Sequence, residues 1–179
     1  MNSDKKATEE RFEEVNMKIE YIKQYQRRNN VIMSGVPQKD NEDIYEILQK
    51  IGEASSFPIS KRDIDIAHRL PTRKATGPQP IVVKFTNRWM KADLLKKKVK
   101  IAASHIGLGS SNQLIFFNDH LTPYQSTLAY KARQLRDRLG GRDKDVATWT
   151  AGGKVFFKRA TDVKANHYKL CCATEFSWS

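Results

Sequence analysis

The chain has 179 residues, room for one ordinary domain or two small ones, and its 29% share of charged residues is typical of a folded protein. Lys and Arg total 32 against 20 Asp and Glu, a formal net charge of +12 that attracts polyanions, of which nucleic acid is the commonest. No apolar run is long enough to span a bilayer and no basic amphipathic helix carries a bulky apolar face, so we expect no membrane partner.

Residues 1–28 have the pattern of a coiled-coil helix. Phe12, Val15, Ile19 and Ile22 follow one another at alternating spacings of three and four residues, as in the seam along which helices associate. This seam is short for a coiled coil. Two interpretations therefore stay open, an oligomer seam or a single amphipathic helix docked on the protein's own core.

Residues 29–118 alternate strand-like and helix-like patterns. The strands are expected at 31–37, 64–70, 81–85 and 114–117, and the helices at 44–51 and 89–99. On the second helix we expect Trp89, Met90 and Leu94 on the buried side. The order β-α-β-β-α-β is that of ferredoxin-like folds, which RNA-recognition modules (RRMs) use, so the sequence predicts an RRM-like α+β domain.

A smaller α+β domain is predicted over residues 119–168. Thr122 and Pro123 have the pattern of a helix start, with a side-chain cap followed by proline in the first turn. Two β-rich pieces then flank the turn at 151–153, which predicts a hairpin. We expect residues 169–179 to form a loose tail.

Several stretches together carry a family resemblance. They are Arg28-Asn29-Asn30-Val31, Gly35-Val36-Pro37, Ala67-His68-Arg69-Leu70, Ile81-Val82-Val83-Lys84-Phe85, Leu121-Thr122-Pro123, Lys131-Ala132-Arg133-Gln134-Leu135 and Lys154-Val155-Phe156. In this order the chain resembles the baculovirus few-polyhedra (FP) protein C-terminal domain family and the first-reading-frame protein of LINE-type retrotransposons, over roughly Phe12 to Tyr168.

The resemblance implies a coiled coil, an RRM-like domain and a small C-terminal domain in that order. It implies trimerisation through the coil and cooperative binding of single-stranded RNA, with nucleic-acid chaperone activity and no catalysis. It also places basic ligand contacts on the helix after Pro123, at Lys131 and Arg133.

Aromatic residues on the two central strands of an RRM stack on bases. Here the strand at 81–85 offers only Phe85, which we expect in the core, and the strand at 31–35 offers none. Phosphate contacts are therefore expected to supply most of the affinity.

Such contacts need exposed Arg and Lys, and Arg grips phosphate with two parallel hydrogen bonds. The candidate nucleic-acid-binding residues are Arg27, Arg28, Arg69, Arg73, Lys74, Lys131, Arg133 and Arg136. Tyr124 and Tyr130 are expected either to stack on bases or to pack in the small core. The lysines around the second helix are interpreted first as a solvated face and second as an accessory phosphate patch: Lys91, Lys96, Lys97, Lys98 and Lys100.

No catalytic residue, metal site or cofactor is predicted. The four histidines are scattered, and the two cysteines, Cys171 and Cys172, are neighbours without zinc-ligand spacing. The sequence lacks a glycine-rich phosphate loop. Asp63 and Asp65 alternate on a predicted strand, and two such carboxylates could bind a metal ion in a nuclease. We favour the interpretation that they lie on a solvated strand edge.

We therefore predict a non-enzymatic protein of retroelement or virus type. It is expected to bind single-stranded RNA or DNA as a coiled-coil oligomer, largely without regard to sequence. The alternative is a structural coiled-coil adaptor that binds a protein partner. The scarcity of cysteine indicates a reducing compartment, and ribonucleoprotein particles in the cytoplasm, the nucleus or both are the expected location.

Overall fold

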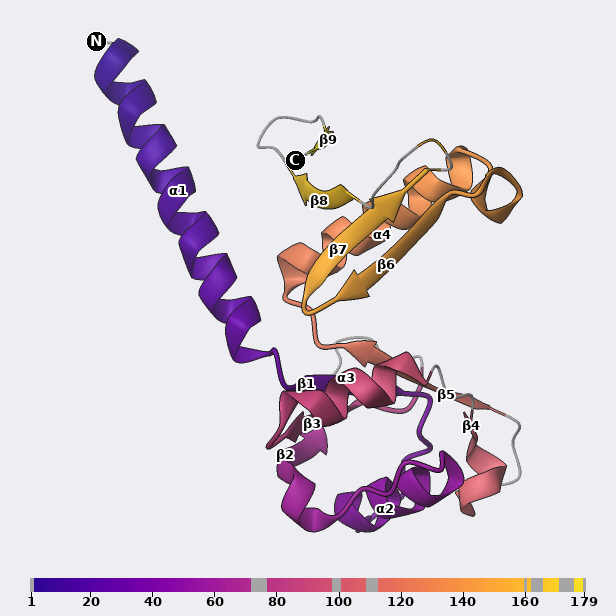
Figure 1. Cartoon of the computed structure of the whole chain (residues 1–179). Helices are drawn as coiled ribbons and strands as arrows, with labels where there is room; N and C mark the ends of the chain where they lie inside the picture. The colour runs from indigo at the N-terminus through magenta and orange to yellow at the C-terminus, as the bar shows by residue number, and fades with distance from the viewer. Residues whose placement is uncertain are drawn as a thin grey trace. The chain divides into compact units, whose positions relative to one another are not determined.

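The computed structural model describes residues 2–71, 77–97, 101–108, 113–159, 161, 166–170 and 176–178. Two compact units make up the chain: Asn29–His120 form one, and Met1–Arg28 together with Leu121–Ser179 form the other (Figure 1). The predicted boundary near residue 118 lies close to the observed one. The N-terminal helix, predicted as a separate segment, belongs to the same unit as the C-terminal part.

The unit Asn29–His120 is built on a five-stranded sheet with strand order β2-β3-β1-β5-β4. Its strands are β1 (Asn30–Ser34), β2 (Ile64–Arg69), β3 (Ile81–Phe85), β4 (Ile101–Ala102) and β5 (Leu114–Asp119). All four neighbouring pairs are antiparallel. The helices are α2 (Ile44–Ala54) and α3 (Arg88–Lys96), with short 3-10 turns at Lys61–Asp63 and Ala103–Ile106. The expected elements are present in the expected order, and the two-residue strand β4 is an addition.

One face of this sheet packs against both helices, because alternate strand residues point to the same side. The buried cluster joins Val31, Met33, Ile81, Val83, Phe85 and Ile115 of the strands to Ile47, Leu48 and Ile51 of α2 and Leu94 of α3. Phe85 has no exposed surface, so its predicted place in the core is confirmed.

The buried stripe of α3 differs from the predicted one. Trp89 is 63% exposed, and its ring lies 5.0 Å from the Arg88 guanidinium. Lys91, expected on the solvated face, is buried instead, with its Nζ 2.6 Å from Oδ1 of Asp119 at the end of β5. At about 100° per residue, Lys91 falls between Leu94 and Leu95 around the helix, so it shares their buried side, where Asp119 supplies its counter-charge.

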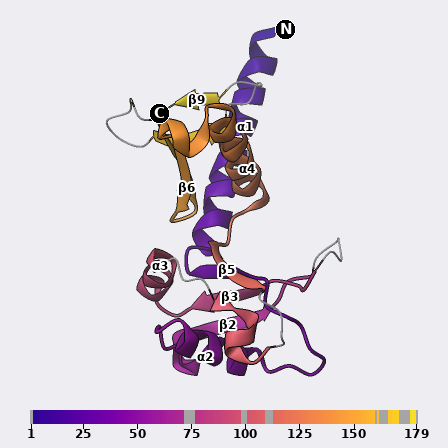
Figure 2. The same cartoon turned by 90° about the vertical axis from the view of Figure 1, so that its right-hand side faces the viewer.

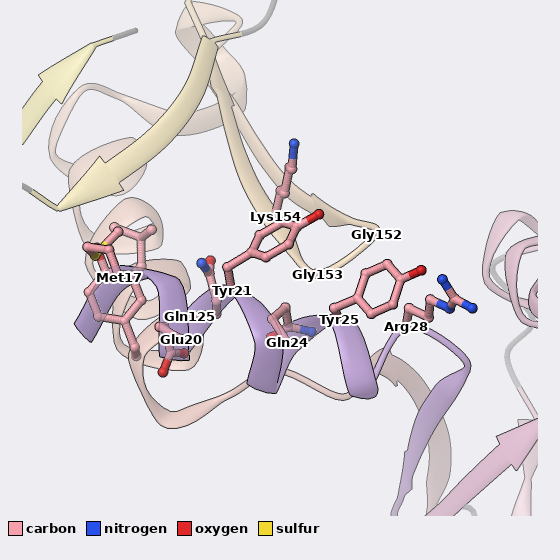
Figure 3. Close-up of a pocket in the computed structure, with 12 residues that line it drawn as sticks. Met17, Glu20, Tyr21, Gln24, Tyr25, Arg28, Gln125, Gly152, Gly153 and Lys154 are labelled. Atoms are coloured by element: carbon pink, nitrogen blue, oxygen red, sulfur yellow. The ribbon is translucent and has the colours of Figure 1, made fainter. Parts of the chain in front are cut away.

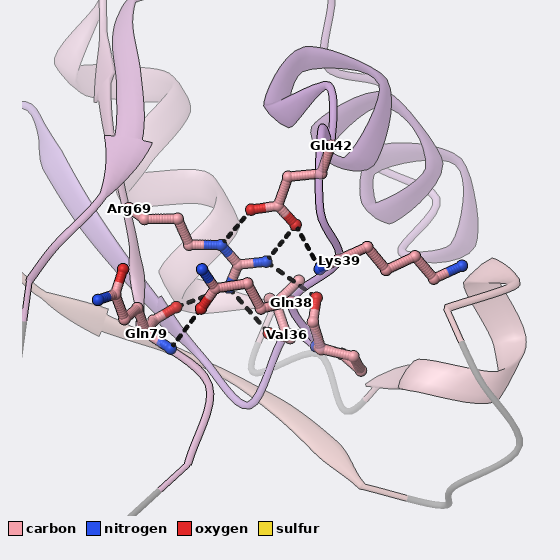
Figure 4. A network of polar contacts seen from close by, with 7 residues as sticks. Val36, Gln38, Lys39, Glu42, Arg69 and Gln79 are labelled. Atoms are coloured by element: carbon pink, nitrogen blue, oxygen red, sulfur yellow. Dashed lines mark hydrogen bonds and ion pairs between the residues drawn. The ribbon is translucent and has the colours of Figure 1, made fainter. Parts of the chain in front are cut away.

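The end of β2 is tied to its surroundings by Arg69, whose side chain is only 9% exposed (Figure 4). Its Nε and Nη2 donate to the two carboxylate oxygens of Glu42 at 2.7 and 2.8 Å. The remaining N–H groups donate to the backbone carbonyls of Val36, Pro37 and Gln79 at 2.6–2.9 Å. All five donors of the guanidinium are thus used inside the unit.

The other unit contains two long helices and a second sheet. The helices are α1 (Asn2–Gln26) and α4 (Pro123–Arg138), with a 3-10 turn at Gly141–Lys144. The antiparallel strands, in spatial order, are β6 (Ala147–Ala151), β7 (Lys154–Lys158), β8 (Asn166–Leu170) and β9 (Phe176–Trp178). The predicted hairpin is β6–β7, shown in orange in Figure 1.

The C-terminal segment differs from the loose tail expected at 169–179. Lys169 and Leu170 belong to β8, and Phe176–Trp178 form a strand paired with it. Backbone pairing along the edge of β8 forms β9, and sequence periodicity alone did not reveal this pairing. In the described part of the chain, no helix is both long and apolar enough to cross a bilayer.

The ion pair between Glu42 and Arg69 predicts a pH-dependent stability. Hydrogen bonds from the guanidinium hold the pKa of the Glu42 carboxyl below its ordinary value. The stabilisation is therefore present above the unfolded pKa of about 4.3 and is lost as the pH falls through the lower folded pKa. Glu42→Gln should reduce the free energy of unfolding by about 3 kcal/mol at neutral pH, because the Arg69 charge is left buried.

Urea denaturation at neutral and acid pH measures this effect. The difference between wild type and Glu42→Gln should shrink in acid, where the wild-type carboxyl is also protonated. Glu46→Gln is the control, since Glu46 pairs with Lys50 on the surface and should contribute little. A difference that stays constant with pH would contradict the role of the Glu42 charge.

Candidate nucleic-acid interface

The structure places the predicted basic residues in different surroundings. Arg69 is fully engaged by Glu42 and three carbonyls, so we assign it a structural role and exclude it from the candidate interface. Arg73 and Lys74 lie outside the described residues. The others are on the unit that contains α1 and α4. They are Arg27 and Arg28 at the end of α1, and Lys131, Arg133 and Arg136 on α4.

Helix α4 begins at a strong cap and buries one side. The Thr122 hydroxyl accepts the Gln125 N–H at 3.2 Å, and proline occupies the first turn, as predicted. Leu128, Ala129 and Ala132 form the buried side, packed against β7.

The cations of α4 lie at different positions around its buried side. At about 100° per residue, Arg133 and Lys131 lie on opposite flanks, whereas Arg136 falls between Ala132 and Ala129 and is only partly exposed. Arg133 is exposed, whereas Arg136 contacts the neighbouring Asp137, with Nη2 2.7 Å from Oδ1. Arg133 is therefore the α4 cation best suited to a phosphate, and not all three face one ligand.

The face of the β6–β7 hairpin that points away from α4 carries an aromatic pair between lysines. Trp149 and Phe156 are cross-strand partners with ring centroids 5.7 Å apart and an interplanar angle of 13°. Trp149 is 41% exposed. The neighbouring pairs bring Lys154 and Lys158 to the same face, because paired residues share a side of the sheet. We call these four residues the hairpin face.

Sequence reasoning missed the hairpin face. Its signal was the alternation along Lys154-Val155-Phe156-Phe157-Lys158, in which Val155 and Phe157 are buried and the other side is basic and aromatic. The pairing of Phe156 with Trp149 also required the register of the hairpin, which places the two rings side by side.

Helix α1 is anchored to this unit by Gln24, which is 8% exposed. Its Oε1 accepts the backbone N–H of Thr122 at 2.9 Å. On the hairpin turn, a Cβ added to Gly153 would lie 2.6 Å from Cγ of Gln24, so only glycine fits there. The amide of Gln24 thus holds α1 against both the start of α4 and the hairpin turn.

A groove with a volume of about 410 Å³ opens beside this anchor, and we call it the α1 groove (Figure 3). Tyr21 and Tyr25 stand along one side of α1, with ring centroids 6.2 Å apart. The Arg28 guanidinium lies over the Tyr25 ring, 4.2 Å from its centroid. Lys154, the first residue of β7, lines the hairpin side of the groove.

The predicted seam lies on the other side of α1. Phe12, Val15, Ile19 and Ile22 are between 43% and 68% exposed. At about 100° per residue, they point away from Gln24 and the groove. The two interpretations left open by the sequence are therefore compatible, because the helix is docked through one face while the seam faces solvent on the other.

The sheet of the unit Asn29–His120 also carries an exposed aromatic residue. Phe116 on β5 is 55% exposed on the face opposite the helices, beside Ser34. On the same face, Lys84 pairs with Asp65 at 2.5 Å. Asp63 instead accepts hydrogen bonds from Ser60, which lower the pKa of its carboxyl. Within the described residues, no group of His, Cys, Asp or Glu could hold a metal ion.

The sequence matches no known family model and no curated protein. The interpretation of the site therefore rests on its own chemistry. That chemistry consists of exposed cations and stacked rings on α1, α4 and the hairpin face.

The anchor at Gln24 predicts the effect of a change on the hairpin turn. Gly153→Val should push Gln24 away and free the Thr122 amide, because the added side chain collides with Gln24. Hydrogen exchange at Thr122 should accelerate by at least about tenfold, the loss expected for one net hydrogen bond.

Gly152→Val is the matched control. Gly152 also has a positive φ, so the substitution strains the turn equally, but an added Cβ meets nothing within 4 Å. Exchange at Thr122 should stay slow in this variant. Equal acceleration in both variants would show that turn strain, and not the Gln24 contact, governs the docking of α1.

Proposed function

We propose that the chain binds single-stranded RNA or DNA, largely independently of sequence and without catalysis. The observation that carries the proposal is the hairpin face, on which the stacked Trp149 and Phe156 lie between Lys154 and Lys158. Stacked rings accept bases of any sequence, and lysines beside them attract the phosphates that join those bases.

The net charge supports the same conclusion. Arg28, Arg133 and Lys154 are exposed on the unit that also carries the hairpin face, and the chain has a formal charge of +12. A single strand that contacts such cations releases counterions, so phosphate contacts supply most of the affinity.

The finer fold assignment is part of this proposal. Four strands in the order β2-β3-β1-β5, with two helices packed on one face, support an RRM-like domain. The stretches that resemble the FP protein and LINE first-reading-frame families favour a retroelement- or virus-type protein of ribonucleoprotein particles, with chaperone activity. Phe116 is the exposed aromatic residue of that domain's open face.

Self-association through the seam completes the proposal, and by resemblance the oligomer is a trimer. The exposure of Phe12, Val15, Ile19 and Ile22 on an undocked helix face supports it. A seam this short is marginal alone, so the oligomer should depend on concentration.

The first prediction concerns affinity. Log affinity for a short random single strand should fall with log salt, with a slope of roughly −0.7 per phosphate contacted. Arg133→Ala should weaken binding several-fold and reduce that slope by about 0.7, because one phosphate contact is lost. Trp149→Ala should weaken binding by about tenfold and leave the slope unchanged, because it removes stacking and no charge.

Fluorescence anisotropy across a salt series gives both quantities. Lys96→Ala on α3 removes an exposed cation from the other unit and should have little effect. An affinity insensitive to salt would contradict the proposal and favour the alternative, an adaptor that binds a protein partner.

The second prediction concerns assembly. Ile19→Asp should yield a monomer, because it places a charge in the seam, whereas Met17→Asp puts the same charge on the opposite face and should leave the oligomer intact. Size-exclusion chromatography with light scattering at tens of micromolar measures the mass. A wild type that is monomeric under these conditions would rule out the seam.

A further inference from the structure

Strand β6 forms one edge of the second sheet (Figure 1). It pairs with β7 on one side, and among the described strands none pairs with its other side. A free edge presents backbone N–H and C=O groups to other strands, so proteins usually protect it with lysine, proline or a β-bulge. The residues of β6, Ala147–Ala151, include no charged residue and no proline, and their register with β7 is continuous. The edge is therefore open to a further strand.

The hairpin turn determines which backbone groups of β6 point outward. Both of its glycines have positive φ, as in a two-residue type I′ turn, so the residues that flank the turn are hydrogen-bonded partners. Hydrogen-bonded pairs alternate along an antiparallel ladder, so the next such pair is Trp149 with Phe156. The N–H and C=O groups of Thr148 and Thr150, on either side of Trp149, therefore point away from β7.

The sequence of β6 is Ala-Thr-Trp-Thr-Ala, which reads the same in both directions. When two copies of this strand pair antiparallel about Trp149, alanine faces alanine, threonine faces threonine and Trp149 faces Trp149. Thr148 of one copy then lies opposite Thr150 of the other, and each threonine pair exchanges two backbone hydrogen bonds through the outward groups. Trp149 falls at a position without hydrogen bonds, where facing side chains are closest and aromatic pairs are favourable. This match of residues and hydrogen-bond pattern favours a second copy over a strand of another protein.

The pairing also brings the two hairpin faces together. Val155 and Phe157 pack toward α4, so Trp149 and Phe156 lie on the opposite face of the sheet. A two-fold axis perpendicular to the sheet puts the α4 helices of both copies on one face and all four rings on the other. The rings then form one stripe across four adjacent strands.

Charge repulsion across this interface is weak. The edge itself is uncharged, and the nearest lysines, Lys154 and Lys158, are on β7. Three strand spacings, about 14 Å, separate the β7 strands of the two copies. That distance exceeds the Debye length of about 8 Å at physiological salt, so the lysines of the two copies are largely screened from one another.

We propose that the edge of β6 is a two-fold interface at which two copies of the chain pair through their backbones, centred on Trp149. The second copy contributes its own Trp149 and Phe156 to a shared face. This interface is separate from the seam of α1, and its formation does not require nucleic acid, so the inference goes beyond the proposed function. An edge of five residues is short, and stable complexes bury about 1,200 Å² or more, so the contact is weak on its own and calls for covalent trapping.

Disulfide trapping in the full-length chain tests the interface and its register. All variants carry Ile19→Asp, which removes the seam, together with Cys171→Ser and Cys172→Ser, which remove the native thiols. Thr148→Cys and Thr150→Cys are prepared separately and then mixed under mild oxidation without nucleic acid. Facing positions of a hydrogen-bonded pair have Cα atoms about 5.5 Å apart, within the reach of a disulfide, so the mixture should form a cross-linked dimer.

Each cysteine variant alone is the matched control. Thr148 of one copy lies diagonally from Thr148 of the other, at about 7–8 Å, which is too far for a disulfide, and the same holds for Thr150. The mixture should therefore cross-link at least about tenfold faster than either variant alone, because thiols held in place have millimolar effective concentrations. Circular dichroism melts of the reduced variants check folding, which should be retained because neither threonine is fully buried.

The rates decide the inference. Faster cross-linking of the mixture supports the pairing about Trp149. Equal rates in the mixture and in the single variants overturn the interface and leave the edge to a strand of another protein, and faster cross-linking of a single variant overturns the register. Because no nucleic acid is present, a failure of this test and a failure of the proposed function are distinguishable.

Discussion

The hydrogen bond between the buried Gln24 side chain and the Thr122 N–H determines how α1 is placed in its unit, beside α4 and the second sheet. It fixes one face of α1 against the start of α4 and the glycine turn at Gly153. Because a helix has a fixed rotation per residue, this contact also turns the opposite face of α1 toward solvent, and that face carries the seam. The groove and the direction in which the seam faces therefore depend on one buried amide.

The two units use arginine in different ways. In the unit Asn29–His120, Arg69 gives all of its donors to Glu42 and backbone carbonyls, so its charge stabilises the fold. In the other unit, Arg133 is exposed on α4 and Arg28 stacks on Tyr25. An arginine whose five N–H donors are all used has none left for a phosphate, whereas a stacked or exposed arginine keeps most of its donors free for one.

Periodicity predicted the order of strands and helices because each element has an apolar face of its own. The expectation that Lys91 is solvated was wrong although its helical position lies between Leu94 and Leu95, because its counter-charge, Asp119, is far away in sequence. For the same reason Arg69 had the sequence features of a phosphate ligand, since its partner Glu42 lies on a distant segment. The hairpin was predictable from its turn, but its stacked aromatic pair needed the register between the strands.

The central claim is that a single strand binds on the unit formed by α1, α4 and the second sheet. Hydrogen exchange with and without a short single-stranded RNA tests it most directly, since it reports the bound segments without any substitution. The account predicts protection at the end of α1, along α4 and in the hairpin β6–β7, with α2 and α3 unchanged. Protection confined to α2 and α3, or none at all, would contradict it.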